Sequence, residues 1–279
     1  MKHFKPAPPI QRIELALVAS CILLLTAIFL PLSFNSQAAP HPAIPAGKAL
    51  AGGSMWIWYM PKKKSQIDAL LNNLRRANIK TVIIKSGDGI NTWQQFNTAA
   101  VDRFHQAGLH VCAWHYVYGS KPLAEAQVSS RAYQQGAECL IIDAEGEYAD
   151  RSKQATQYLK RLRALTSKNW LLGLSAFPYT YYHKDFPYQV FLGPGGATVN
   201  LPQMYWKDIG VSPAQVVADT YELNQELGKP VYPAGQTWRD PDPQQIKEFL
   251  QAVKKSGAPG WSWWDYNQTS PRGWQAIRG

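Results

Sequence analysis

From position 54 onward, runs of apolar residues alternate with amphipathic stretches at a regular spacing. About 25 to 32 residues separate the starts of successive runs, the length of one strand, one helix and two connecting loops. Eight such units predict an α/β fold, a closed (β/α)8 TIM barrel. An open doubly wound sheet is the alternative, but no Gly-x-Gly-x-x-Gly motif follows the first run. The runs begin near Met55, Thr81, His110, Cys139, Leu171, Val199, Val231 and Gly260.

The stretches between the runs carry signals of helix starts. Ser65 with Asp68 forms a capping-box pattern, which predicts a helix beginning there. Ser212 and Asp242 are each followed by proline, so each predicts the start of a further helix. The last unit is short, because residues 271–278 leave room for only about two helical turns.

The first 38 residues have a different pattern. Lys2, Lys5 and Arg12 precede an apolar run over residues 15–34, which is typical of an export signal. The run is long enough to span a bilayer, and small residues allow cleavage after Ala38. A cleaved signal and a retained anchor therefore both remain open, and either places the rest of the chain outside the cytoplasm.

The sequence therefore divides into three parts. Residues 1–38 are predicted to be a signal peptide or a signal anchor. Residues 39–52, rich in proline, alanine and glycine, are predicted to be a linker. Residues 53–279 are predicted to form the TIM-barrel domain, secreted or tethered to the membrane by the N-terminal segment.

Composition narrows the classes of protein. Hydrophobic residues make up 46% and charged residues 17% of the chain, which excludes disorder or a coiled coil for most of it. The net charge of +10 suits a polyanionic cell wall or membrane surface, or serves solubility alone. Cys112 and Cys139 lie on neighbouring predicted strands, where they could form a disulfide, although we expect adjacent free thiols. We expect no cofactor or metal, since the six histidines show no metal-binding spacing, and no nucleic-acid partner.

Two carboxylates mark the end of the fourth predicted strand, residues 139–145 (CLIIDAE). Side chains alternate along a strand, so Asp143 and Glu145 point the same way, roughly 6.5 Å apart. Their like charges favour a proton on one of them. A protonated Glu145 beside an ionised Asp143 is what glycosidic cleavage requires. The alternative is a solvated or salt-bridged loop pair, because Glu147 and Asp150 follow.

Other predicted strand ends add a pattern that resembles a known family. The segments are 83–89 (IIKSGDG), 114–116 (WHY), 142–145 (IDAE) and 265–267 (DYN). Together they resemble the family 25 glycoside hydrolases, the lysozyme-type muramidases, over most of the barrel. The resemblance implies that the Glu of the third segment is the catalytic acid, that the Asp two positions before it assists, and that the Asp of the last segment lines the site.

The chain also departs from that family. Its first strand, residues 55–59 (MWIWY), contains no Asp, although the family has one there. The sixth strand, residues 201–206 (LPQMYW), resembles the Met-x-Tyr-Asp strand of family 18 chitinases, which implies that Tyr205 orients a substrate N-acetyl group. Trp206 stands in place of the chitinase Asp, and Ile141 replaces another Asp of that family's fourth strand.

These patterns predict an exported glycoside hydrolase acting on an N-acetylhexosamine-containing glycan, with peptidoglycan as the foremost substrate. Glu145 is the expected general acid; Asp143 steadies charge at the anomeric carbon or holds the N-acetyl group as internal nucleophile. A catalytically silent glycan-binding module is one alternative, and an aldolase-type enzyme with Lys85 as Schiff-base lysine is another, although we expect Lys85 to pair with a carboxylate. The candidate substrate-binding residues are Trp58, Asp88, His115, Gln203, Tyr205, Trp263 and Asp265.

Overall fold

The structure is a computed structural model that describes residues 46–278. The predicted signal or anchor segment, residues 1–38, and residues 39–45 of the predicted linker lie outside the described residues. Within 46–278, no helix combines the length and the apolar character needed to cross a membrane.

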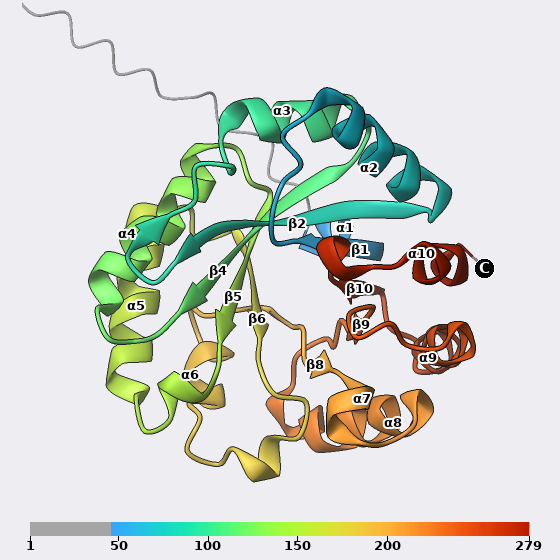
Figure 1. Ribbon diagram of the computed structural model, residues 1–279. Coiled ribbons are helices and arrows are strands. Elements are labelled where there is room, and N and C mark those ends of the chain that lie inside the picture. Colours follow the sequence, from blue (N-terminus) through green and yellow to red (C-terminus); the bar gives the residue numbers. More distant parts are fainter. Residues whose placement is uncertain (1–45, 279) are drawn as a thin grey trace, which may run out of the picture. The chain divides into compact units, whose positions relative to one another are not determined.

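Strands and helices alternate along the described chain (Figure 1). The strands are β1 (Gly52–Ile57), β2 (Ile79–Asp88), β3 (Asn91–Thr92), β4 (His110–Val117), β5 (Cys139–Ala144), β6 (Leu171–Ser175), β7 (Val199–Asn200), β8 (Gln203–Met204), β9 (Ala234–Gln236) and β10 (Gly260–Trp264). The α-helices are α1 (Ala46–Ala49), α2 (Lys64–Arg76), α3 (Thr98–Gln106), α4 (Pro122–Gln134), α5 (Ser152–Leu165), α6 (Tyr188–Phe191), α7 (Trp206–Ile209), α8 (Pro213–Asn224), α9 (Pro243–Lys255) and α10 (Pro271–Ile277).

The strands form one curled, parallel sheet in the order β7-β6-β5-β4-β2-β1-β10-β9-β8, to which β3 adds a short antiparallel pair with β2. The two ends of this order, β7 and β8, belong to one run of chain, residues 199–204. The run bonds on both sides: Leu201 donates its N–H to the Leu174 carbonyl at 2.7 Å, and Ala234 donates to the Pro202 carbonyl at 3.1 Å. The predicted α/β barrel is thus confirmed as a TIM-barrel-like fold, with helices around the sheet (Figure 1).

Side-chain alternation divides the buried residues into two layers. One layer fills the inside of the sheet and includes Trp56, Ile83 and Ile141. The other, larger layer packs the outer face of the sheet against the helices. Inside the sheet the strands approach closely at Gly173, where an added Cβ would lie 2.7 Å from Leu201, so a larger residue would displace the neighbouring strands.

The predicted helix starts are confirmed in two of three cases. The side chains of Ser212 and Asp242 each accept a backbone N–H from the first turn of α8 and α9, as a cap should. The prediction at Ser65 is wrong, because α2 begins one residue earlier, at Lys64. The Asp68 carboxylate pairs with the Lys64 ammonium at 2.8 Å rather than with the helix N-terminus.

The predicted linker is wrong from residue 46 onward, since that part belongs to the barrel. Leu50 is buried in the inner layer, beside Cys112 and Cys139. The Ala49 carbonyl accepts a hydrogen bond from the Thr81 hydroxyl at 2.7 Å. These apolar residues precede β1 directly, so they fill the inside of the barrel where a tether was expected.

The expectation of free thiols is also wrong, because Cys112 and Cys139 form a disulfide. The two residues are direct partners in the parallel register of β4 and β5. Both face the inside of the sheet, and their Cα atoms lie 4.6 Å apart. This separation is within the range that a disulfide bridges.

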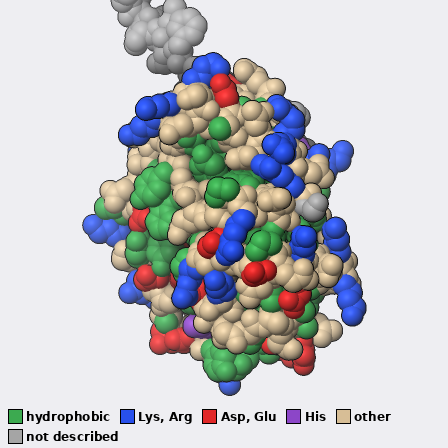
Figure 2. All heavy atoms as spheres, turned by 45° about the vertical axis from the view of Figure 1, so that its right-hand side comes forward, with side chains coloured by type: hydrophobic (Ala, Val, Ile, Leu, Met, Phe, Trp, Pro, Cys, Tyr) green, Lys and Arg blue, Asp and Glu red, His purple; other side chains and the backbone are tan. Residues whose placement is uncertain are grey.

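The basic side chains do not gather in one place on the face drawn in Figure 2. Lys and Arg lie scattered over it, with acidic and apolar side chains between them (Figure 2). The positive net charge therefore does not mark a binding surface on this face.

Candidate active site

The two predicted catalytic carboxylates meet at the carboxyl end of β5. Asp143 is buried near the end of the strand, and Glu145 follows it half-buried. Gln203 of β8 donates its side-chain amide to both, with Nε2 3.1 Å from Asp143 Oδ1 and 2.9 Å from Glu145 Oε1. Ser175 Oγ, at the end of β6, lies 3.3 Å from the same nitrogen. One amide thus joins the carboxyl groups of Asp143 and Glu145 into a single unit.

Both carboxyl groups of this pair hold protons more tightly than isolated ones. Burial raises the pKa of Asp143 well above its usual value, and the charge of Glu145 raises it further. Burial also raises the pKa of Glu145, while hydrogen bonds from Gln203 and Asp143 offset part of the effect. Burial of both groups therefore favours a proton on the pair, as expected from the sequence.

Tyr205 brings a phenol group to the same mouth. It directly follows β8, and burial raises the pKa of its hydroxyl well above the usual value. The charges of Asp143, Glu145 and Asp265 raise that pKa further, which places all three acids near the hydroxyl. The Tyr205 hydroxyl therefore stays protonated and is available as a hydrogen-bond donor beside the carboxylate pair.

Asp265 is fully buried just after β10. Neither of its carboxylate oxygens has a hydrogen bond of normal geometry. Burial raises the pKa of Asp265 to about 6, and nearby N–H groups of Gln268 and Asn267 offset the burial only in part. A buried carboxyl without a good partner is costly in its charged form, so Asp265 titrates close to neutral pH.

Tryptophan side chains form a wall at the mouth. Trp58 and Trp264 are both partly exposed, and their ring centroids lie 5.6 Å apart. Trp264 also packs edge to face on the buried Trp114 at 5.2 Å. Partly exposed rings held by buried rings offer rigid flat apolar surfaces beside the carboxylates, as sugar rings require for stacking.

Two predicted substrate-binding residues face away from this mouth. Trp263 is fully buried against Phe249 of α9, at a centroid distance of 5.3 Å. The His115 ring is held between Ser129 Oγ of α4 at 2.6 Å and the Gly89 carbonyl at 2.9 Å. Burial lowers the pKa of His115 to about 4, so the ring is neutral. Both residues lie on the outer side of their strands and belong to the sheet–helix packing.

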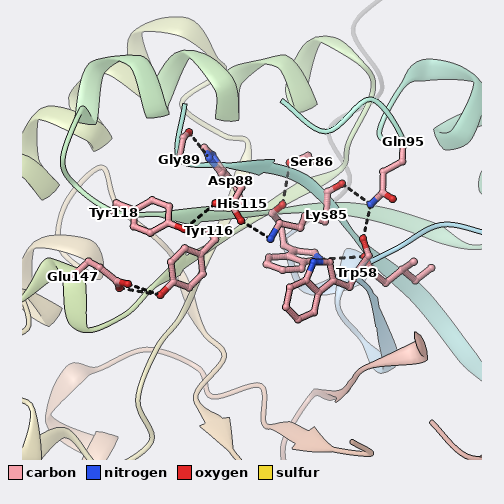
Figure 3. A network of polar contacts seen from close by, with 12 residues as sticks. Trp58, Lys85, Ser86, Asp88, Gly89, Gln95, His115, Tyr116, Tyr118 and Glu147 are labelled. Carbon is pink, nitrogen blue, oxygen red and sulfur yellow. Dashed lines mark hydrogen bonds and ion pairs between the residues drawn. The ribbon is translucent and has the colours of Figure 1, made fainter. Parts of the chain in front are cut away.

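Three residues that were not among the predicted site residues also reach the mouth: Trp264, Tyr116 and Glu147. Trp264 faces inward because it lies two positions after Ser262, whose hydroxyl accepts from Trp56 inside the barrel at 2.9 Å. The Tyr116 hydroxyl donates to Glu147, 2.9 and 3.0 Å from its two oxygens (Figure 3). Glu147 therefore lies at the rim of the site, although its side chain is exposed to solvent. Strict alternation along β10 and β4 was the signal that could have found Trp264 and Tyr116.

Lys85 and Asp88, at the end of β2, form an ion pair of 2.7 Å (Figure 3). Lys85 thus has the carboxylate partner that the sequence analysis expected. The other oxygen of Asp88 accepts from the Tyr118 hydroxyl at 2.9 Å. Among residues 46–278, no group of three or more His, Cys, Asp or Glu side chains is arranged to hold a metal ion.

Comparison with known proteins finds likeness in structure only. The sequence matches no known protein family and no curated protein. Among solved structures, the spore cortex-lytic enzyme SleL of Bacillus cereus matches with a TM-score of 0.63 and 12% identity, over 81% of this chain and 73% of that chain.

Two chitinases match in the same way. The class V chitinase of Pseudomonas fluorescens gives a TM-score of 0.58 at 13% identity, over 82% of this chain and 98% of that chain. The chitinase of Chromobacterium violaceum gives 0.56 at 10% identity, with the same coverage. At such low identity these likenesses establish the TIM-barrel-like class of fold and nothing finer.

Proposed function

We propose that this protein is an exported glycoside hydrolase that cleaves an N-acetylhexosamine-containing glycan, with peptidoglycan as the foremost substrate. The observation that carries the proposal is the pair Asp143 and Glu145, joined by the Gln203 amide next to the Tyr205 phenol. The similar folds of a cortex-lytic enzyme and two chitinases support the glycoside hydrolase class. They do not single out the family 25 muramidases.

Glu145 is the general acid of the proposed reaction. It is the less buried of the two carboxyl groups, so it is the one that a bound glycan reaches first. Burial raises its pKa, which favours the protonated form that a general acid requires. Glu145 gives that proton to the glycosidic oxygen as the bond to the anomeric carbon breaks.

Asp143, Gln203 and Tyr205 surround the place where an acetamido group would lie. The amide of Gln203 and the hydroxyl of Tyr205 are donors suited to its carbonyl oxygen, and the carboxylate of Asp143 accepts its N–H. Asp143 acts in one of two ways: it holds the N-acetyl group as internal nucleophile, or it steadies positive charge at the anomeric carbon. Asp265 and Trp58 complete the proposed substrate site.

Export is part of the proposal. The apolar run at 15–34 follows basic residues, and the buried disulfide between Cys112 and Cys139 is typical of proteins outside the cytoplasm. Membrane tethering depends on whether cleavage occurs after Ala38. Mass spectrometry of the native N-terminus distinguishes the two routes, and an intact chain found in the cytoplasm would contradict both.

A glycan-binding module without turnover is the second candidate. Residues 55–59 contain no carboxylate, and Trp58 occupies the mouth end of β1. A binding surface needs flat apolar rings for sugars to stack on, which the tryptophans supply. It does not need the first-strand Asp that the family 25 glycoside hydrolases carry and this chain lacks.

Turnover separates the two candidates. Purified protein is incubated with peptidoglycan and with chito-oligosaccharides, and new reducing ends are measured beside calorimetric binding. The proposal expects new reducing ends from at least one glycan. Binding without new reducing ends would favour the glycan-binding module. The absence of both binding and new reducing ends would contradict both candidates.

A further inference from the structure

A β-bulge in β2 turns two charged residues toward the inside of the barrel. Lys85 pairs in register with Trp114 of β4, and Gly87 pairs with His115, so Ser86 is the extra residue. Gly87 faces outward, since an added Cβ would lie 2.6 Å from a side chain of α4. Because a bulge shifts the alternation by one residue, Lys85 and Asp88 face the same side.

The Lys85 ammonium is enclosed on several sides. Its side chain is only 3% exposed, and Nζ lies 4.5 Å from the ring centroids of Trp93 and Trp114 and 5.0 Å from that of Trp58. Asp88 completes the enclosure (Figure 3). A charge held this way is fixed in position and poorly screened by water, so it acts on its neighbours over a longer range than a surface lysine.

The charge of Lys85 acts on Asp143. Asp88, Tyr116 and Asp143 lie at one level across β2, β4 and β5, and Lys85 starts one level below. The charge of Lys85 lowers the pKa of Asp143, and the charge of Asp88 raises it. Directly below Asp143 on its own strand, Ile141 supplies no charge.

We propose that Lys85 is a positioning residue that sets the protonation of Asp143, and through Asp143 that of the Asp143–Glu145 pair, from two strands away. Asp88 moderates the effect of Lys85, because its opposite charge also acts on Asp143. Lys85 touches no reacting atom in this role; it acts through Asp143. The other titratable groups that face the pair are Glu147, Tyr116 and Tyr205.

The role rests on the proposed hydrolase function, and it has a definite sign. Without the Lys85 charge, Asp143 releases its proton at higher pH, and the coupled pair therefore titrates at higher pH. Without the Asp88 charge, the pair titrates at lower pH. A residue that served only packing would produce no such pair of opposite changes.

The test compares Lys85→Met with Asp88→Asn in the full barrel. Lys85→Met keeps the packed stem and removes the charge, so both limbs of the pH–rate profile should move up by about one pH unit. Asp88→Asn should move both limbs down by a smaller amount. Lys80→Met is the matched control, because Lys80 is an exposed lysine on the same strand, five residues toward its start, and it should leave the profile unchanged. Lys85→Arg restores the charge and should restore the parental profile.

Carbon NMR titration of the Asp143 side-chain carboxyl gives the same comparison without turnover. Shifts of opposite sign in Lys85→Met and Asp88→Asn support the inference even if no glycan is cleaved, in which case only the proposed function fails. Unchanged titration in both variants, or shifts of the same sign, would overturn it while leaving glycan cleavage intact. If Lys85→Met does not fold, Asp88→Asn alone decides the sign.

Discussion

The Gln203 amide reaches Glu145 across the full width of strand β6, with Nε2 2.9 Å from Oε1. The same nitrogen contacts Asp143, which lies on the strand that leads into Glu145. Two carboxyl groups joined by one donor titrate as a pair rather than as separate groups. The protons of this pair therefore govern the pH dependence of any reaction at the mouth.

Glu145→Gln keeps the shape of the side chain but cannot supply a proton. We expect kcat for glycan hydrolysis to fall roughly 10²- to 10⁴-fold, with binding retained because the tryptophan wall is unchanged. Steady-state kinetics and calorimetry measure the two quantities. Glu222→Gln, an exposed change on α8, is the matched control and should behave like the parent. Equal turnover by Glu145→Gln and the parent would exclude Glu145 as the acid.

Asp143→Asn should lower activity and also change its pH dependence. In the parent, the second proton leaves the pair at high pH because the first carboxylate is already charged. With Asn at 143, Glu145 titrates without a like charge beside it, so the alkaline limb of the pH–rate profile should move to lower pH. A pH–rate profile for kcat/KM shows the shift. An alkaline limb at the parental pH would mean that the limb belongs to another group.

The fold could be predicted from the sequence because the spacing of the apolar runs equals the length of one strand, one helix and two loops. Each predicted apolar run lies on a strand or within a few residues of one. The errors arose where contacts between distant parts of the chain determine the structure. Leu50 lies in a stretch with the composition of a linker, yet it is buried inside the barrel. Cys112 and Cys139 are brought together by the register of β4 and β5.

The site could be predicted from the sequence only in part, because the sequence does not show which side chains of each strand face inward. Asp143, Glu145, Gln203 and Tyr205 come together because each stands at the end of a strand. Trp263 was predicted to bind substrate in place of Trp264, because the sequence alone does not show which of the two faces the inside of the barrel. The bulge at Ser86 also changes the parity of β2, and no sequence pattern marked it.

The two adjacent tryptophans of β10 should respond differently to substitution. Trp264→Ala should weaken glycan binding, because it removes a partly exposed ring from the mouth. Trp263→Ala should instead destabilise the fold by roughly 3 to 5 kcal/mol, since it leaves a cavity against Phe249. Thermal melting and calorimetry on both variants check the pair. Weaker binding in a fully stable Trp263→Ala would reverse the assignment of the two faces.

Removal of the disulfide should weaken the barrel without opening the mouth. The bridged residues are 27 positions apart, and lost loop entropy of this size corresponds to roughly 3 kcal/mol. The double variant Cys112→Ala and Cys139→Ala should therefore unfold at lower urea concentration than the parent. Thiol titration of denatured chain beginning at residue 39 should find no free thiol, since only these two cysteines remain there. Two free thiols in protein isolated from its native compartment would contradict the disulfide.

Asp265 should make the stability of the barrel depend on pH in a defined direction. Its pKa is about 6 in the fold and about 3.9 in an unfolded chain. Its contribution to stability is therefore fully present below about pH 4 and is lost as the pH rises through about 6. The loss amounts to roughly 3 kcal/mol, because one pKa unit corresponds to about 1.4 kcal/mol.

Asp265→Asn cannot titrate and so should not suffer this loss. The free energy of unfolding of the variant, relative to the parent, should rise by roughly 3 kcal/mol between about pH 4 and about pH 7.5. Urea denaturation of both proteins at the two pH values measures the change. Asp240→Asn is the control, since hydrogen bonds from Ser270 and Arg272 lower the pKa of Asp240 and the sign should be opposite. A difference between Asp265→Asn and parent that stays constant with pH would show that Asp265 is not a buried, titrating carboxyl.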